Sequence, residues 1–170
     1  FMISFPDIND DSLIEDERWH DILPDNASLV AMSLDHIMKN IDLFENAREI
    51  ELSITLSNDA NVRNLNRDYR NKDKPTNVLS FQQIDWAKDN IDANNPLIML
   101  GDVIVALETI EREAHEQEKR LQDHFIHMLV HSVLHLCGYD HEIETDAEAM
   151  EKLEIGILNE MGIKNPYQTA

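Results

Sequence analysis

The clearest hydrophobic pattern in the chain is a strict alternation of apolar and polar residues over positions 50–56. Such alternation is typical of a β-strand with one buried face. Residues 78–81 form a short apolar segment that predicts another strand. Residues 97–107 predict one or two buried strands with an irregular join at Gly101 and Asp102. The polar N-terminal segment predicts no more than a short strand around residues 3–8.

Apolar residues three or four positions apart predict helices in much of the remaining chain. A short helix should begin after Ser57 or Asn58, either of which can cap it, with Val62 and Leu65 on one face. The longer helical segments are residues 27–44, 107–121, 123–137 and 144–161. Residues 82–96 are polar and include an Asn-Asn-Pro sequence, so we expect a loop there. These elements predict an α+β fold, a small sheet with helices packed on it.

The length of 170 residues predicts a single domain over residues 1–170. No apolar run approaches the ~20 residues that span a bilayer, so we expect no membrane partner. The sequence has no basic leader followed by an apolar segment and a cleavage site, and its one cysteine leaves no internal disulfide. These features favour a cytoplasmic protein.

The formal net charge of −20 argues against a nucleic-acid partner, because binding to a polyanion depends on Lys and Arg. The basic residues are unevenly distributed, however. Five of the 14 fall within twelve positions: Arg63, Arg67, Arg70, Lys72 and Lys74. A solvated loop is the ordinary interpretation of such a run, and a phosphate-binding surface is the functional one. The position of this run between two ordered-looking segments favours the functional interpretation.

The segment "HSVLHLCGYDHE", residues 131–142, carries three histidines at metal-ligand spacing. His131 and His135 are four apart, so a helix places both imidazoles on one face, close enough to share an ion. Gly138 is a natural helix stop, after which the chain can turn and bring His141 back toward the other two. Three imidazoles and one open position are typical of catalytic zinc. The alternative is three unrelated histidines, which the glycine and the third spacing disfavour.

The same segment lacks the general base of a zinc protease. In the protease pattern H-E-x-x-H-x-x-G-x-x-H, a glutamate follows the first histidine, but here position 132 is Ser. Asp140 or Glu142 could stand in for that base, or could orient a ligand imidazole from outside the metal shell. Alternatively, the reaction needs only a metal-bound hydroxide and a cation, which suits phosphodiester cleavage.

The remaining histidines and the cysteine are assigned to packing or to the surface. His127 lies one turn before His131, and three histidines in a line along a helix cannot all reach one ion, so it packs or supports the ligands. The surface assignment covers His20, His36, His115 and His124. Cys137 is interpreted as a small buried thiol.

Two segments together resemble the signatures of a known family. "LNRDYRNKDKPTNVLSF", residues 65–81, and "HSVLHLCGYDHE" closely resemble the two signature segments of the YbeY family of bacterial metal-dependent endoribonucleases, also described as ribosomal RNA maturation factors. "GDVIVALET", residues 101–109, is similar to a third family segment. The resemblance extends over roughly residues 50–160.

The resemblance implies a fold, a cofactor and a substrate. The fold would be a small mixed sheet with packed helices and a zincin-like metal-bearing helix. One zinc ion per chain would be held by His131, His135 and His141, and Arg70 would be the key catalytic residue that is not a ligand. The substrate would be single-stranded RNA, cut in 16S ribosomal RNA 3′-end maturation and ribosome quality control. The implied partners are ribosomal RNA, ribosomal particles and a ribosome-associated GTPase.

Further assignments come from the residues that surround these positions. The basic residues that would assist substrate binding are Arg63, Arg67, Lys72 and Lys74, and those that would support the metal ligands are Asp140 and His127. The chain departs from the family in having Ser132 and Asn71 where members commonly have Gly. Ser is small enough for a tight helix contact, and Asn tolerates left-handed φ better than most residues.

Two other functions fit parts of the pattern. A small metallopeptidase with an unorthodox base would share the metal site, but Ser132 argues against it. A zinc-stabilised ribosome assembly factor that is not an enzyme would hold the metal without an open, labile position. Activity on an RNA oligomer and on a peptide library would separate these alternatives.

Overall fold

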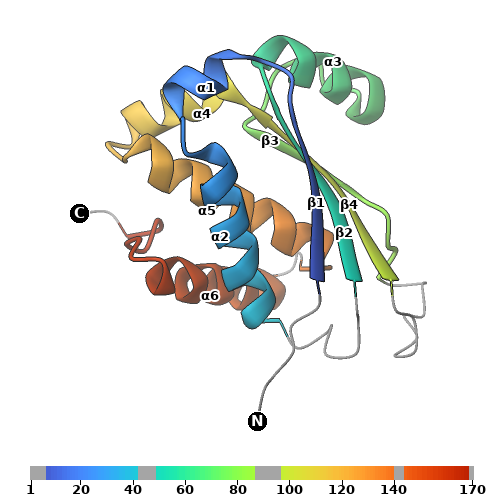
Figure 1. Cartoon of the computed structure of the whole chain (residues 1–170), viewed down its shortest axis with the longest axis vertical. Coiled ribbons are helices and arrows are strands. Elements are labelled where there is room, and N and C mark those ends of the chain that lie inside the picture. The colour runs from blue at the N-terminus through green and yellow to red at the C-terminus, as the bar shows by residue number, and fades with distance from the viewer. Residues whose placement is uncertain (1–6, 42–48, 87–96, 140–143, 169–170) are drawn as a thin grey trace.

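The computed structural model describes residues 7–41, 49–86, 97–139 and 144–168, which form a mixed α+β fold (Figure 1). The elements in chain order are β1 (Asp7–Ile14), α1 (Arg18–Ile22), α2 (Asn26–Lys39), β2 (Glu49–Ser57), α3 (Asp59–Arg70), β3 (Val78–Gln82), β4 (Leu97–Ala106), α4 (Leu107–Glu116), α5 (Leu121–Leu136) and α6 (Glu144–Glu160). The predicted fold class, a small sheet with packed helices, is therefore confirmed.

The sheet has four strands in the order β1-β2-β4-β3. The first three run parallel and β3 is antiparallel to β4, so the sheet is mixed, as the resemblance implied. The join predicted near Gly101 is an irregularity in the pairing of β4 with β2, where Leu100 has no partner across from it. Gly101 has φ +136°, and a Cβ there would lie 2.0 Å from the carbonyl oxygen of Phe81, so only glycine fits.

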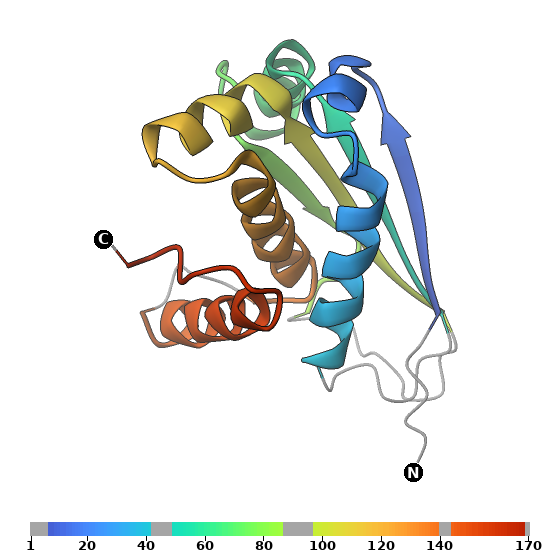
Figure 2. The same cartoon turned by 60° about the vertical axis from the view of Figure 1, so that its left-hand side comes forward.

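One face of the sheet is covered by helices, as Figures 1 and 2 show from two directions. The inward residues of β2 pack with α2 and α5 in the main core, and α6 lies on α5 away from the sheet. The other face carries α3, whose Val62 packs on Leu79 of β3 and Ile104 of β4. Helix α5, which carries His131 and His135, is therefore buried between the sheet and α6.

The local predictions were most accurate where periodicity was strong. Asn58 caps α3, accepting a hydrogen bond of 2.9 Å from the backbone N–H of Asn61. The strand expected around residues 3–8 was misplaced, since β1 begins at Asp7 and runs to Ile14, and residues 1–6 lie outside the described part of the chain. Helix α1 was not predicted. It carries the fully buried Trp19, which donates a 2.8 Å hydrogen bond to the carbonyl of Ser57.

Candidate active site

A groove of about 1130 Å³ brings together the two segments that the sequence singled out. One wall comes from α5, including His131 and His135, and another from β3 and the loop before it. Arg70, Lys72 and Lys74 belong to the same lining. The basic run and His131 are more than 50 positions apart in sequence, and β3, packed on α5, joins them.

His131 and His135 have the relation expected from their spacing. Their ring centroids are 4.7 Å apart, and the ring planes are inclined by 83°. Helix α5 ends at Leu136, and Gly138 then adopts φ +95°, as predicted for a helix stop. A Cβ at Gly138 would lie 2.7 Å from Cγ of Trp86, so glycine also allows an indole ring to close this end of the groove.

The pair fits a metal ion in chemistry and arrangement. Two imidazoles on successive turns can share one ion. The His131 ring is hydrogen-bonded to the Glu154 carboxylate, and metal-bound histidines commonly have such a partner. Within the described ranges, no cluster of three His, Cys, Asp or Glu side chains that could hold a metal is present. His141 and Asp140 fall outside those ranges, so the third ligand and the predicted supporting aspartate stay predictions.

Glu154 of α6 is the main site residue that was not predicted from the sequence. Its side chain is fully buried, and it accepts hydrogen bonds from Nδ1 of His131, from Nε2 of His127 at 3.3 Å and from the hydroxyl of Tyr167. Burial raises the pKa of this carboxyl, but the three donors outweigh it and lower the pKa to about 2. A signal was present, because Glu154 lies within the apolar stripe of its helix, four positions after Met150.

The predictions for the other histidines and for the cysteine are partly right and partly wrong. His127 lines the groove and contacts the carboxylate that binds His131. The surface assignment is wrong for His124, which is 2% exposed and lies 3.1 Å from Glu113. Burial, which neighbouring Glu113 opposes, lowers the pKa of His124. Cys137 is buried as predicted, and burial raises the pKa of its thiol to about 12.

Arg70 lies at the C-terminal end of α3, beside the edge strand β3. Its Nη2 donates a 2.7 Å hydrogen bond to the carbonyl oxygen of Ser80, and its guanidinium lies 5.5 Å from the ring centroid of Phe81. Asn71 ends the helix in the left-handed region, with φ 56°, so the departure from glycine is accommodated. Asp73, an acidic residue in the same part of the sequence, pairs with Arg63.

The other basic residues of the run occupy two different positions. Lys72 and Lys74 line the groove, whereas Arg63 and Arg67 do not belong to its lining. Arg63 contacts Asp73 at 2.8 Å and Arg67 contacts Asp68 at 3.1 Å, both on exposed surface. The structure therefore brings three of the five predicted cations to the histidines, and a substrate contact for the other two stays a prediction.

The second departure from the family is at Ser132. This residue is fully buried, and its hydroxyl donates a 2.6 Å hydrogen bond to the carbonyl of Met128. Ser80 of β3 in turn donates to the carbonyl of Ser132 at 3.4 Å. The backbone next to His131 is thus in contact with the edge strand, and the serine side chain is accommodated at a fully buried position.

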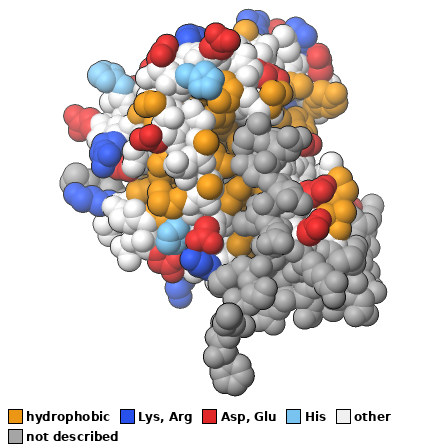
Figure 3. Space-filling model, in the orientation of Figure 1, with side chains coloured by type: hydrophobic (Ala, Val, Ile, Leu, Met, Phe, Trp, Pro, Cys, Tyr) orange, Lys and Arg blue, Asp and Glu red, His pale blue; other side chains and the backbone are white. Residues whose placement is uncertain are grey.

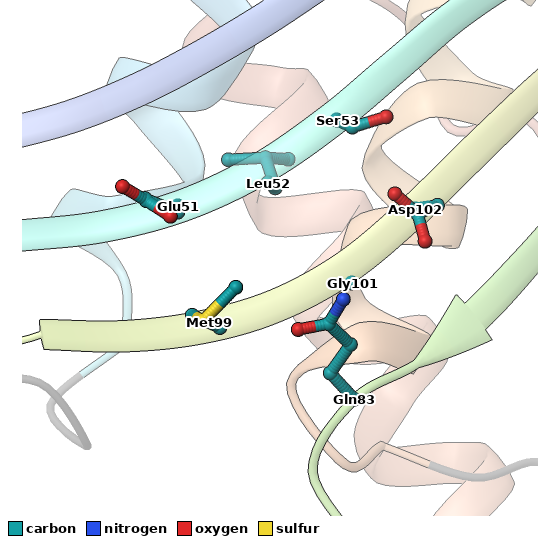
Figure 4. A pocket seen from close by; sticks show the side chains of 7 residues that line it. All are labelled: Glu51, Leu52, Ser53, Gln83, Met99, Gly101 and Asp102. Carbon is teal, nitrogen blue, oxygen red and sulfur yellow. The ribbon is translucent and has the colours of Figure 1, made fainter.

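Outside this groove, the described surface offers weaker candidates. Acidic and basic side chains are interspersed on the face shown in Figure 3. A smaller cavity of about 330 Å³ lies on the sheet face away from α5, and its lining includes Glu51, Met99 and Asp102 (Figure 4). That lining contains carboxylates but no histidine or basic residue among the described residues, whereas the larger groove has both. The helices described here include none long and apolar enough to cross a membrane.

Comparisons with known proteins agree with the sequence resemblance. The family model described as Endoribonuclease YbeY matches residues 14–162. Endoribonuclease YbeY of Paramagnetospirillum magneticum is 46% identical over 149 residues, which cover 88% of this chain and 89% of that protein. Endoribonuclease YbeY of Rhizobium etli is 48% identical over 118 residues, covering 69% and 67%.

The fold is also found in a solved structure. The solution structure of TM1509 from Thermotoga maritima aligns with a TM-score of 0.55 at 20% identity, covering 95% of this chain and all of that one. At this identity the likeness concerns the fold alone. The family follows from the sequence matches, which include both signature segments and extend over most of the chain. The chain therefore belongs to the YbeY family of endoribonucleases.

Proposed function

We propose that this protein is a zinc-dependent endoribonuclease that cuts single-stranded RNA, with residues 1–170 acting as one metallo-endoribonuclease domain. Its role would be 16S ribosomal RNA 3′-end maturation and ribosome quality control in the cytoplasm, on ribosomal particles and with a ribosome-associated GTPase as a further partner. The relatives named Endoribonuclease YbeY support the RNA-cleaving activity. The observation that carries the proposal is the shared groove of His131, His135 and three basic side chains.

The residues that would hold zinc are His131 and His135, with His141 as the third ligand. This assignment gives α5 the role of a zincin-like metal-bearing helix. A zinc ion bound there supplies a Lewis acid and a water of lowered pKa. Asp140 would support the ligands from outside the metal shell, as His127 would through Glu154.

The cations of the groove suit a phosphodiester better than a peptide bond. Arg70 carries a planar guanidinium that can bond two phosphate oxygens at once, and its bond to Ser80 anchors it at the edge of β3. Lys72 and Lys74 would neutralise neighbouring phosphates. Arg63 and Arg67, outside the groove lining, would contact RNA further along the strand.

Aromatic side chains beside Arg70 suit an unpaired strand. Tyr69 is 71% exposed, and its ring packs edge-on against Phe81 with centroids 5.7 Å apart. Phe81 belongs to the groove lining. Exposed aromatic rings next to cations are the usual means of binding single strands, because every base has a face that can stack.

The proposal is tested by zinc removal and by histidine variants. The chelated protein should lose cleavage of a single-stranded RNA oligomer and regain it with added zinc, while duplex RNA should be cut slowly. His131→Ala and His135→Ala should each lose bound zinc and RNA cleavage, and His115→Ala, an exposed histidine on α4, should keep both. Cleavage of a peptide library instead of RNA would favour a metallopeptidase. Tight zinc with no cleavage of either substrate would favour a non-enzymatic assembly factor.

A further inference from the structure

Glu154 is a charged side chain that contacts residues from two other parts of the chain, α5 and the segment after α6. It projects from α6, which lies against α5 (Figures 1 and 2). Its Oε1 faces Nδ1 of His131, and its Oε2 faces both Nε2 of His127 and the Tyr167 hydroxyl. Among the described residues, the hydrogen-bond and ion-pair partners of Glu154 include no Lys or Arg, so its buried charge depends on these donors.

The chemistry of these contacts fixes where protons lie. A carboxylate that receives several donors is an acceptor, so the imidazole nitrogens that face it carry hydrogen. Nδ1 of His131 is then the N–H nitrogen, and Nε2 carries the lone pair. Since His131 lines the groove and is 26% exposed, its ring is accessible from the groove while its other side is held by the buried carboxylate.

We infer that Glu154 is a positioning residue that fixes the tautomer and ring orientation of His131, so that Nε2 is presented as the metal-ligand nitrogen. The inference rests on the proposed function, because it assigns His131 to zinc. The carboxylate itself touches neither zinc nor RNA. Acceptors in this position orient metal-bound histidines and raise their basicity, and removing one commonly weakens metal affinity 10- to 100-fold.

His127 and Tyr167 hold the carboxylate in its own orientation. The two rings lie edge-on with centroids 5.6 Å apart, and both bind Oε2. This leaves Oε1 directed at His131. The last described segment of the chain therefore contributes to the geometry of a histidine on α5.

A purely structural role for Glu154 would give different results from a positioning role. A structural residue would change the melting temperature without a selective effect on the His131 proton. Two variants separate these roles. Glu154→Gln keeps the shape but loses the charge, and Glu154→Asp keeps the charge but withdraws the oxygen from His131. Glu160→Gln is the matched control, since Glu160 is on the same helix and contacts His36 at the surface, at 3.3 Å.

The experiment measures two quantities separately, which are the tautomer of His131 in metal-free protein and the affinity of the protein for zinc. Two-bond ¹H–¹⁵N correlation spectra should assign the hydrogen of His131 to Nδ1 in the wild type and in Glu160→Gln. In Glu154→Gln and Glu154→Asp that hydrogen should no longer be confined to Nδ1. Competition with a chromophoric chelator should show a zinc dissociation constant raised about tenfold or more in both variants and unchanged in the control.

The outcomes keep this inference apart from the proposed function. Folded Glu154 variants that retain the wild-type tautomer and zinc affinity would overturn the role of Glu154, whatever their RNA cleavage. Weaker zinc binding with an unchanged tautomer would also overturn it. If wild-type protein binds no zinc through His131, the proposed metal site fails instead, whichever tautomer is found. Should Glu154→Gln fail to fold, the same two measurements on Glu154→Asp decide the question.

Discussion

Arg70→Ala is the substitution that best separates catalysis from structure in this groove. The guanidinium makes one hydrogen bond to the Ser80 carbonyl and lies over the Phe81 ring at an exposed site. A hydrogen bond contributes about 1 kcal/mol net and an exposed cation–π contact about 0.5–1 kcal/mol, so their loss costs at most about 2 kcal/mol. In a protein of this length each kcal/mol lowers the melting temperature by about 2–4 °C. The variant should therefore stay folded at 25 °C and keep its zinc.

The expected effect on cleavage is much larger. Loss of one donor that stabilises developing charge commonly reduces the rate ~10²-fold or more, about 2.7 kcal/mol. The assay is single-turnover cleavage of a labelled single-stranded RNA oligomer at 25 °C, with zinc content and melting temperature measured on the same samples. Arg70→Lys retains the charge but not the planar fork, so it should not restore the rate. Arg112→Ala, an exposed arginine paired with Glu116 on α4, is the control.

Three results would refute this reasoning about Arg70. Cleavage by Arg70→Ala at the wild-type rate would remove it from the catalytic step. Loss of zinc or of the folded state would make it a structural residue that fastens α3 to β3. Full rescue by Arg70→Lys would show that only a diffuse positive charge is needed.

Other predictions concern the groove and its surroundings. RNA affinity should fall with added salt, with a log–log slope of about −2 from the three groove cations and about −3.5 when Arg63 and Arg67 also contact phosphates. Lys72→Ala and Lys74→Ala should each reduce the slope by roughly 0.7 in binding titrations, and a slope near zero would contradict the phosphate contacts. Gly138→Ala should lower the melting temperature more than Gly162→Ala, because both glycines have positive φ but only the first meets an indole ring; equal losses would assign the effect to backbone strain alone. Cys137, whose pKa of about 12 keeps it a thiol as pH rises through 8, should resist iodoacetamide until denaturant is added, and rapid labelling of native protein would contradict its burial.

Sequence periodicity predicted the elements that build the groove because each has a strong local signal. The alternation over 50–56 became β2, and the apolar segment before Ala106 became one strand with an irregular pairing. The first strand was misplaced because β1 is an edge strand rich in Asp, so its sequence lacks the alternation that a half-buried strand shows. Its pairing with β2 is a long-range effect that local propensity does not encode.

The sequence predicted which side chains of one helix lie together, but not the contacts that join different elements. The spacing of His131 and His135 specifies their shared face, since both lie on one helix. The contact of Glu154 with that face joins two helices, and only its polar position in an apolar stripe pointed to burial. His124 was misassigned because a histidine with a carboxylate partner can be buried, and Glu113 lies on the preceding helix. A lone histidine in a sequence gives no sign of such a partner.

Strand β3 explains how an arginine on α3 can keep a constant position relative to histidines on α5. It pairs with β4 on one side, which fixes its register. Ser80 accepts the Arg70 bond through its carbonyl and donates from its hydroxyl to the carbonyl of Ser132, the neighbour of His131. Gln82 further along the strand donates to the carbonyl of His135. Because β3 bonds to α5 next to one histidine and at the other, a shift of the strand would move Arg70 relative to both. These contacts use the backbone carbonyls of α5, whereas the Ser132 side chain is fully buried and bonds to the carbonyl of Met128, so a larger side chain at this position would disturb the packing next to His131.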